Sequence, residues 1–238
     1  MKVTRPLGYP RKIADGPAKS DVERMSRRFL VEPDSASAEP FRTLRLALET
    51  RLRTTNTKGL VFTSPRSRDG RSTIAANYAV VAAFVQRPVL LIDADMRNPS
   101  MHEMFGLPRS PGLVDALREE LAPWEVVHTF PSLGGLHVMT AGTPLARTAD
   151  VAASPAMAEL LQRAFEEWEA VVIDSPPTLV AADASGLASL PGTAIVMVVH
   201  RSGKRRHVVG ALRKLALMEA NVLGLVVNQE RPLTADLY

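Results

Sequence analysis

The stretch GLVFTSPRSRDGRST, residues 59–73, joins a short apolar run to a polar loop and to the first residues of a helical pattern. In this setting, backbone N–H groups at the start of a helix can bind phosphate oxygens. Gly70 allows a phosphate to approach closely, and Ser72 offers a hydroxyl to a magnesium ion. The usual phosphate-loop pattern is G-x-x-x-x-G-K-[ST], and here Pro65 replaces the first glycine and Arg71 replaces the lysine. Taken alone, the stretch therefore also fits an ordinary strand–helix turn.

Further apolar runs follow along the chain and alternate with helical patterns. They are rich in Val, Ile and Leu and show little polar alternation, which is typical of strands buried on both faces. Strand–helix alternation predicts an α/β fold with a doubly wound, mostly parallel sheet and helices on both faces. The predicted strands are 59–63, 89–93, 136–140, 170–174, 194–199 and 222–228, and the predicted helices are 36–53, 72–86, 155–168 and 204–219.

The first of these helices shows the clearest periodicity. Leu44, Leu48 and Leu52 recur every four residues, with Phe41 one turn before them. This spacing predicts an amphipathic helix, and Ser35 or Ser37 is the expected N-terminal cap.

Composition limits the class of protein. The chain has 238 residues, of which 46% are hydrophobic and 23% charged, as in a globular protein with a sizeable core. It has no cysteine, which excludes disulfides, cysteine-ligated zinc and iron–sulfur clusters. No apolar run reaches the roughly 18–20 residues that cross a bilayer, and the N-terminus does not resemble a secretory signal. We therefore expect a cytoplasmic protein.

Charge is unevenly distributed. Residues 1–58 hold 13 Lys and Arg against 7 Asp and Glu, whereas the remainder holds 16 against 18. Residues 1–35 are also rich in Pro and Gly, so we expect a flexible basic segment with one short strand at 28–31. Aromatic residues interleaved with the basic ones would favour nucleic acid, and their absence predicts no nucleic-acid partner.

Polar residues end several predicted strands, at the sheet edge where open α/β folds bind ligands. Asp93 and Asp95, in LLIDADMRNPS, point to the same side of an extended chain, and two close carboxylates require a cation. Magnesium fits this requirement, although a helix cap and an ion pair with Arg97 would fit as well. Asp174 ends another strand, where its carboxylate could hold a metal-bound water. Asn228 ends a further strand, where its amide could contact the edge of a nucleotide base. Together these residues predict a nucleotide-binding site, for which magnesium would be a fitting cation.

These motifs resemble the bacterial tyrosine kinases, or BY-kinases, of capsule and exopolysaccharide systems, a branch of the deviant-Walker P-loop ATPases. The resemblance runs from about Glu32 to Asn228. SASAEPFRTLRLAL is similar to the E-x-x-R-x-x-R helix of the family, and TSPRSRDGRST to its Walker A loop. VLLIDADMRNPSMHEMFGLPRSPGLVDAL is similar to the Walker A′ segment with its following helix, and VVIDSPPTLVAADA to the Walker B segment. The resemblance implies a P-loop NTPase-like domain over residues 36–230, with 231–238 as a short tail.

The resemblance also implies roles for single residues. Asp93 would be the catalytic base, assisted by Arg71 and Asp174. Magnesium would be held by Ser72, Asp95 and Asp174. ATP would contact Asn228 through adenine and, through its phosphates, the loop residues Ser67, Arg68, Asp69, Gly70, Arg71, Ser72 and Thr73. An interface in a homo-oligomeric ring would contain Glu39, Arg42 and Arg45.

The implied function is that of an ATP-binding cytoplasmic protein-tyrosine autokinase that controls the biosynthesis and export of exopolysaccharide or capsule. Its partner would be the cytoplasmic tail of a membrane polysaccharide co-polymerase, or chain-length regulator. This partner would place the chain peripherally at the inner membrane. A tyrosine phosphatase would be a further partner.

Two departures from the family leave other functions open. Arg71 replaces the phosphate-binding lysine, and the tyrosine-rich tail is missing, so that Tyr238 alone remains as the candidate phosphoacceptor there. The alternative is a catalytically impaired pseudokinase that serves as a scaffold in the same system. A spatial-organisation ATPase of the MinD or ParA type is a third candidate, but Pro65 stands where those proteins have an additional lysine.

Overall fold

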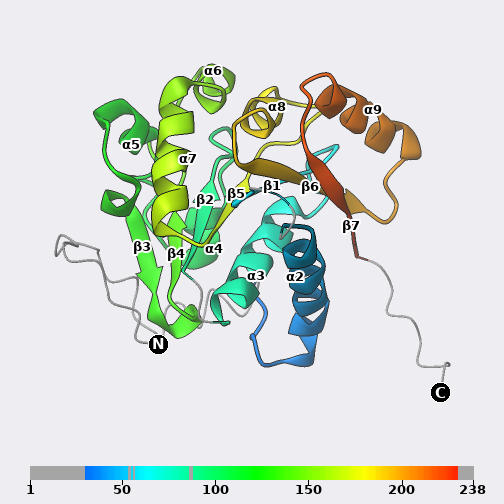
Figure 1. Cartoon of the computed structure of the whole chain (residues 1–238), viewed down its shortest axis with the longest axis horizontal. Coiled ribbons are helices and arrows are strands. Elements are labelled where there is room, and N and C mark those ends of the chain that lie inside the picture. The colour runs from blue at the N-terminus through cyan, green and yellow to red at the C-terminus, as the bar shows by residue number, and fades with distance from the viewer. Residues whose placement is uncertain (1–29, 53–54, 56, 86–87, 230–238) are drawn as a thin grey trace.

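The computed structural model describes residues 30–52, 55, 57–85 and 88–229. Within them, seven strands form one sheet in the order β3-β4-β2-β5-β1-β6-β7, and helices lie on both sides of it (Figure 1). All neighbouring strands are parallel except β3 and β4. The predicted doubly wound, mostly parallel sheet is thus confirmed. The strands are β1 (Gly59–Thr63), β2 (Val89–Asp93), β3 (Val127–Phe130), β4 (Leu136–Met139), β5 (Ala170–Asp174), β6 (Thr193–His200) and β7 (Val222–Asn228).

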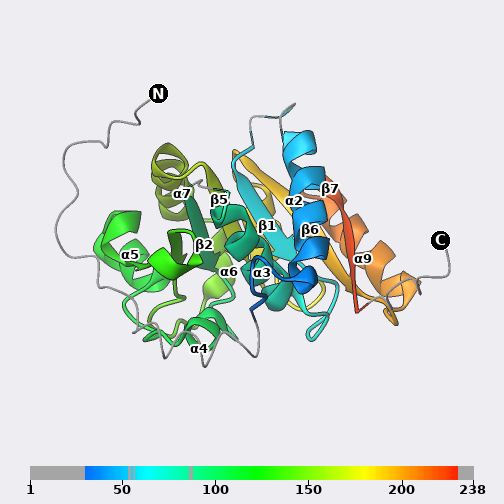
Figure 2. The ribbon, with the colours of Figure 1, turned by 90° about the horizontal axis from the view of Figure 1, so that it is seen from below.

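Each face of the sheet has its own apolar core. On one face, α2, α3 and α4 pack on the sheet, and Figure 2 shows α2 and α3 lying across it. On the other face, α5, α7, α8 and α9 form the second core. The helices are α2 (Glu39–Leu52), α3 (Arg71–Ala83), α4 (Met101–Phe105), α5 (Leu113–Glu119), α6 (Thr148–Ala152), α7 (Pro155–Glu167), α8 (Asp183–Ala188) and α9 (Arg205–Ala216), with short 3₁₀ turns η1 (Ala36–Ala38), η2 (Pro123–Glu125) and η3 (Pro131–Leu133).

The predicted strands agree closely with the observed ones, with two exceptions. β3 was not predicted, since VHTF is only four residues long and pairs antiparallel with β4 at the edge of the sheet. β7 was expected to be buried on both faces, and this is wrong: Leu225 and Val227 are 50% and 51% exposed. The reason is position, because β7 is the other edge strand and has β6 as its one neighbour among the described strands.

The predicted helices are also confirmed, with shifted ends. In α2, Leu48 is buried, and Phe41, Leu44 and Leu52 pack against the same core. The expected capping by Ser35 or Ser37 is wrong. The Ser35 hydroxyl donates to the carbonyl of Glu32, and Ser37 lies inside the turn η1, through which the chain enters α2.

Two further findings concern the strand expected near the N-terminus and the expected absence of membrane-spanning segments. The expected strand over 28–31 lies partly outside the described residues, and Leu30 and Val31 are not in a strand. Among the described helices, none has the length and apolar character needed to cross a membrane.

The strand order brings the chemically important residues together. β5 lies between β1 and β2, and Asp93 is the register partner of Asp174. Because these three strands are parallel, their carboxyl ends meet at one edge of the sheet. The loop after β1, the segment after β2 and the segment after β5 therefore share one site.

Candidate nucleotide site

The loop between β1 and α3 is held by its own polar side chains. Asp69 accepts a hydrogen bond from the backbone N–H of Arg66 at 3.1 Å, and the hydroxyl of Ser64 donates to the carbonyl of Arg66 at 2.8 Å. Gly70 has φ +88° and directly precedes α3, and no side chain caps the helix. The first N–H groups of α3 therefore remain available to an anion, as a phosphate site requires.

Asn228 fixes the far side of this loop. Asn228 is the last residue of β7, and its side-chain amide donates a hydrogen bond to the backbone carbonyl of Asp69 at 3.0 Å. A Cβ atom on Gly70 would lie 1.9 Å from the same amide nitrogen. The positive φ thus favours glycine at position 70, and a side chain there would displace the amide of Asn228 from the loop. The predicted contact of Asn228 with adenine stays a prediction, and its observed contact is with the loop.

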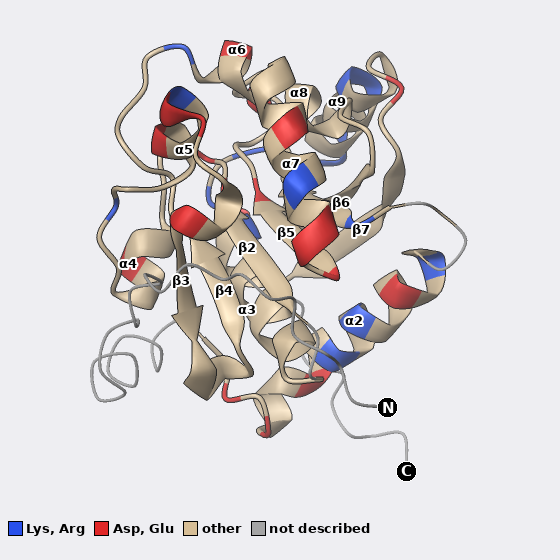
Figure 3. Cartoon of the chain, turned by 60° about the vertical axis from the view of Figure 1, so that its left-hand side comes forward, with Lys and Arg blue, Asp and Glu red and all other residues tan. Residues whose placement is uncertain are grey.

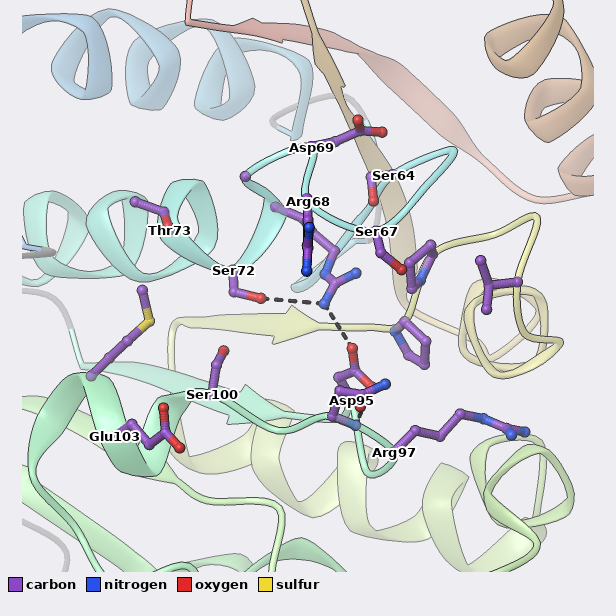
Figure 4. Close-up of a pocket in the computed structure, with 17 residues that line it drawn as sticks. Ser64, Ser67, Arg68, Asp69, Ser72, Thr73, Asp95, Arg97, Ser100 and Glu103 are labelled. Carbon is purple, nitrogen blue, oxygen red and sulfur yellow. Dashed lines mark hydrogen bonds and ion pairs between the residues drawn. The ribbon is translucent and has the colours of Figure 1, made fainter. Parts of the chain in front are cut away.

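Arg71 lies at the centre of the site. Its side chain is buried, and its Nε donates to Asp174 at 2.6 Å. One terminal nitrogen donates to Asp95 at 2.8 Å and to the hydroxyl of Ser72 at 3.2 Å; Figure 4 marks these last two contacts. The residue that departs from the phosphate-loop pattern therefore bridges all three predicted magnesium ligands.

The charges explain why this arrangement is stable. Burial lowers the pKa of Arg71, but the carboxylates of Asp174, Asp95 and Asp93 outweigh burial and raise it above its ordinary value. A guanidinium is therefore charged here at all physiological pH values, and it compensates two buried carboxylates.

Asp93 has a different environment from Asp95. One of its oxygens accepts from the backbone N–H groups of Ser100 and Met101, both at 2.9 Å, so that Asp93 holds the start of α4. Burial, together with the nearby charge of Asp174, raises the pKa of Asp93 to about 8. Asp93 does not line the cavity described below. Its predicted role as the catalytic base therefore stays a prediction, and a substrate would reach Asp93 only after the site opened.

A cavity of about 540 Å³ lies in front of these groups. It is bordered by the loop and the first turn of α3 on one side and by the segment between β2 and α4 on the other (Figure 4). Asp95 and Arg71 reach it, whereas Asp93 and Asp174 are not among the residues that line it. The lining residues are Ser64, Ser67, Arg68, Asp69, Gly70, Arg71, Ser72, Thr73, Asp95, Arg97, Asn98, Ser100, Glu103, Met104, Pro176, Pro177 and Val180.

Sequence reasoning missed part of this lining. Arg97 was considered only as a partner for the aspartates, but it pairs at 3.3 Å with Asp183, a fully buried residue at the start of α8. Ser100 and Glu103 belong to the quoted Walker A′ segment and face the same cavity. The sequence feature that could have identified them as cavity residues was their position shortly after the carboxyl end of β2.

The donor atoms at the predicted magnesium site are of a suitable kind, and all but Oδ2 of Asp174, which is buried without a hydrogen-bond partner, are already in use. Asp95 accepts from Arg71 with one oxygen and from the backbone N–H of Asn98 with the other. One oxygen of Asp174 also accepts from Arg71. Among the described residues, no cluster of three or more His, Cys, Asp or Glu side chains is arranged to hold a metal. The described arrangement thus does not fit a divalent ion while Arg71 remains in place.

The predicted interface residues on α2 make contacts within the chain. Arg42 pairs with Glu39 at 2.6 Å and donates to the carbonyl of Pro33, and Arg45 pairs with Glu49 at 2.8 Å. Their role between subunits stays a prediction. Tyr238, the predicted phosphoacceptor, lies outside the described residues.

Comparison with known proteins supports the geometry. Residues 58–235 match the family described as ParA, NUBPL iron-transfer P-loop NTPase. The tyrosine-protein kinase YwqD of Bacillus subtilis is 31% identical over 90% of this chain and 90% of its own length. The kinase domain of the Escherichia coli tyrosine kinase ETK superposes with a TM-score of 0.78 at 26% identity, covering 86% of this chain and 80% of that domain.

Other relatives are much longer than this chain. The putative tyrosine-protein kinase EpsB of Ralstonia nicotianae is 32% identical over 85% of this chain, which spans 27% of that protein. The shared fold, the order of the motifs and the identity to YwqD lead to one conclusion. This chain belongs to the bacterial tyrosine-protein kinases, within the ParA group of P-loop NTPases.

Proposed function

We propose that this chain binds ATP in the cavity at the start of α3 and transfers its terminal phosphoryl group to a protein tyrosine. The observation that carries the proposal is the convergence, around one cavity, of an uncapped helix start, the loop held by Asp69 and Asn228, and the carboxyl ends of β1, β2 and β5. Phosphoryl transfer depends on positioning and charge neutralisation more than on covalent chemistry, and these features supply both.

The loop and the first turn of α3 would hold the phosphates. Backbone N–H groups of the first helical turn donate to phosphate oxygens, and Arg68 adds a positive charge from the rim of the cavity. Arg97 approaches from the other side. Pro176 and Pro177 form an apolar part of the wall and limit water near the reacting oxygen.

The tyrosine hydroxyl would need a base on the α4 side of the cavity. Asp95 is the carboxylate that both lines the cavity and contacts Arg71. Asp93 lies two residues earlier, and Ser100 and Glu103 line the cavity where α4 begins. A tyrosine entering over α4 would therefore meet the carboxyl end of β2 first.

A basic surface beside the cavity supports an acidic protein segment as the substrate. We call it the basic rim, and it consists of Arg66, Arg68, Arg201, Lys204, Arg205 and Arg206, all exposed. Within the described part of the chain, no carboxylate forms an ion pair with any of them. α9 begins inside this rim without an acidic residue in its first turn, and Figure 3 shows the basic residues of α9.

The positive charges of the basic rim act on one another. The pKa of His207 is lowered by desolvation and by the charges of Arg66, Arg206 and Lys204. Arg66, Lys204 and His207 line a small cavity of about 170 Å³, together with Asp69. Positive charge at a helix N-terminus is unfavourable, and an acidic segment would relieve it. We therefore propose that the tyrosine-bearing partner is an acidic segment. We further propose that this segment belongs to the cytoplasmic tail of a membrane polysaccharide co-polymerase.

The test is phosphotyrosine mapping. The purified chain is incubated with Mg²⁺ and ATP, alone and with an acidic tyrosine-containing tail peptide, and analysed by mass spectrometry. The proposal predicts phosphotyrosine on the peptide or on the chain, and less of it when Arg205 and Arg206 are changed to Glu. Complete absence of phosphotyrosine with an Arg71→Lys variant as well as with the natural chain would refute the proposal.

A further inference from the structure

We propose that the guanidinium of Arg71 acts as a built-in cation of the nucleotide site and competes with divalent metal, so that nucleotide binding depends little on Mg²⁺. This inference rests on the proposed function for the presence of a nucleotide. It concerns a residue in which this chain departs from the usual phosphate-loop pattern.

The contacts of Arg71 show the competition directly. A divalent ion at the predicted position needs oxygen atoms of Ser72, Asp95 and Asp174. Arg71 already contacts one oxygen of each of these three side chains, at 3.2, 2.8 and 2.6 Å. Because the guanidinium holds one oxygen of each of these side chains, a divalent ion at this place would meet a second positive charge, and the two cations compete. Oδ2 of Asp174 is the oxygen that the guanidinium leaves open, since it is buried without a hydrogen-bond partner.

The position of Arg71 favours the guanidinium. Its side chain is tethered at the first residue of α3, is 9% exposed, and lies against Asp174, which is fully buried. A tethered group acts at a high effective concentration, whereas a metal ion must be captured from solution and must lose water. The planar fork of Arg71 also spans two carboxylates at once, which a lysine ammonium at this position does less well.

Besides Arg71, the cavity offers phosphates two arginines, of which Arg97 also pairs with Asp183, alongside the carboxylates of Asp69 and Glu103. Arg68 and Arg97 line it, and the uncapped start of α3 faces the loop. Arg71 itself neutralises the carboxylates that would otherwise repel a phosphate. A nucleotide can therefore enter without a divalent ion between its phosphates and Asp95.

Two binding measurements test the inference. The first is Mn²⁺ binding to the nucleotide-free protein, followed by electron paramagnetic resonance. The second is ADP and ATP binding by calorimetry, with excess Mg²⁺ or with EDTA. The variants are Arg71→Met, which removes the guanidinium, and Arg71→Lys, which keeps a charge. Arg118→Met is the control, because Arg118 is an exposed arginine of α5 that does not line the cavity and forms no ion pair with a described residue. Circular dichroism establishes folding.

The inference predicts that the natural chain and Arg118→Met bind Mn²⁺ weakly. Mg²⁺ should change their nucleotide affinity by less than about fivefold, the lower end of ordinary coupling between two ligands. Arg71→Lys, and Arg71→Met if it folds, should bind Mn²⁺ more tightly and should show coupling of about tenfold or more.

Equal Mn²⁺ binding by the natural chain and by folded Arg71 variants would overturn the inference, as would strong Mg²⁺ coupling in the natural chain. Absence of nucleotide binding in every variant would count against the proposed function alone, because the Mn²⁺ comparison would still decide the competition between Arg71 and metal.

Discussion

Replacement of Arg71 by methionine is the perturbation whose effect follows most directly from the structure. Methionine keeps much of the length and apolar volume of arginine but removes its charge. Asp174 is fully buried and Asp95 is 3% exposed, so both carboxylates would lose their compensating charge. The variant should therefore be much less stable than the natural chain at neutral pH.

The size of the effect can be estimated from the two contacts. Removing one partner of a buried ion pair typically costs about 3–5 kcal/mol, because the remaining charge stays buried without compensation. Part of this loss is recovered if Asp174 takes up a proton. We therefore expect Arg71→Met to lower the free energy of unfolding by about 3 kcal/mol, and the double variant Arg71→Met/Asp174→Asn to be more stable than Arg71→Met.

Urea unfolding at neutral pH, followed by circular dichroism, measures these differences. Arg68→Met is the control, since Arg68 is exposed and a surface substitution of this kind changes stability by about 0.5 kcal/mol or less. If Arg71→Met were as stable as Arg68→Met, the ion pairs of Arg71 would not stabilise the fold and the reasoning would be wrong.

Three other predictions concern the loop, the β3–β4 edge and the basic rim. Gly70→Ala should weaken ATP binding and lower stability by about 1–2 kcal/mol or more from its positive φ, with the clash against Asn228 in addition. Gly135→Ala is its control, because Gly135 has φ +80° but free space at Cβ, and calorimetry and urea unfolding compare the two. Burial lowers the pKa of His137, so folded protein binds fewer protons than unfolded protein below about pH 6.5, and stability should fall as pH decreases through this range. His137→Phe, which keeps a ring beside Trp168, should make this pH dependence shallower in thermal unfolding. Replacing Arg205 and Arg206 with Glu should weaken binding of an acidic tail peptide and reduce its salt dependence in fluorescence titrations, while ATP binding changes little.

Much of the fold could be predicted because the central strands are continuous apolar runs that end in polar residues. β1, β2 and β5 were found with their observed bounds, and the meeting of Asp93 with Asp174 followed once the strands were taken as parallel neighbours. β3 was missed because a four-residue strand carries too few residues for a clear pattern. Exposure of β7 could not be predicted, since it depends on which strand lies at the edge.

The contacts of the site were less predictable than its position. Arg71 and Asp174 are separated by 103 positions in the chain, and their hydrogen bond depends on side-chain geometry at the junction of β1, β5 and α3. Sequence indicated a cation between the aspartates and assigned it to magnesium. The structure instead places there a cation that the chain itself supplies, and the residue noted as a defect of the loop is the one that provides it.

Calorimetric titration of ATP into the purified chain tests the central claim most directly, namely that the cavity at the start of α3 binds a nucleotide. We predict one bound ATP per chain, in Mg²⁺ and in EDTA alike, and a large loss of affinity in Gly70→Ala. Folded protein that binds no ATP under either condition, or binds it equally well after Gly70→Ala, would contradict the account.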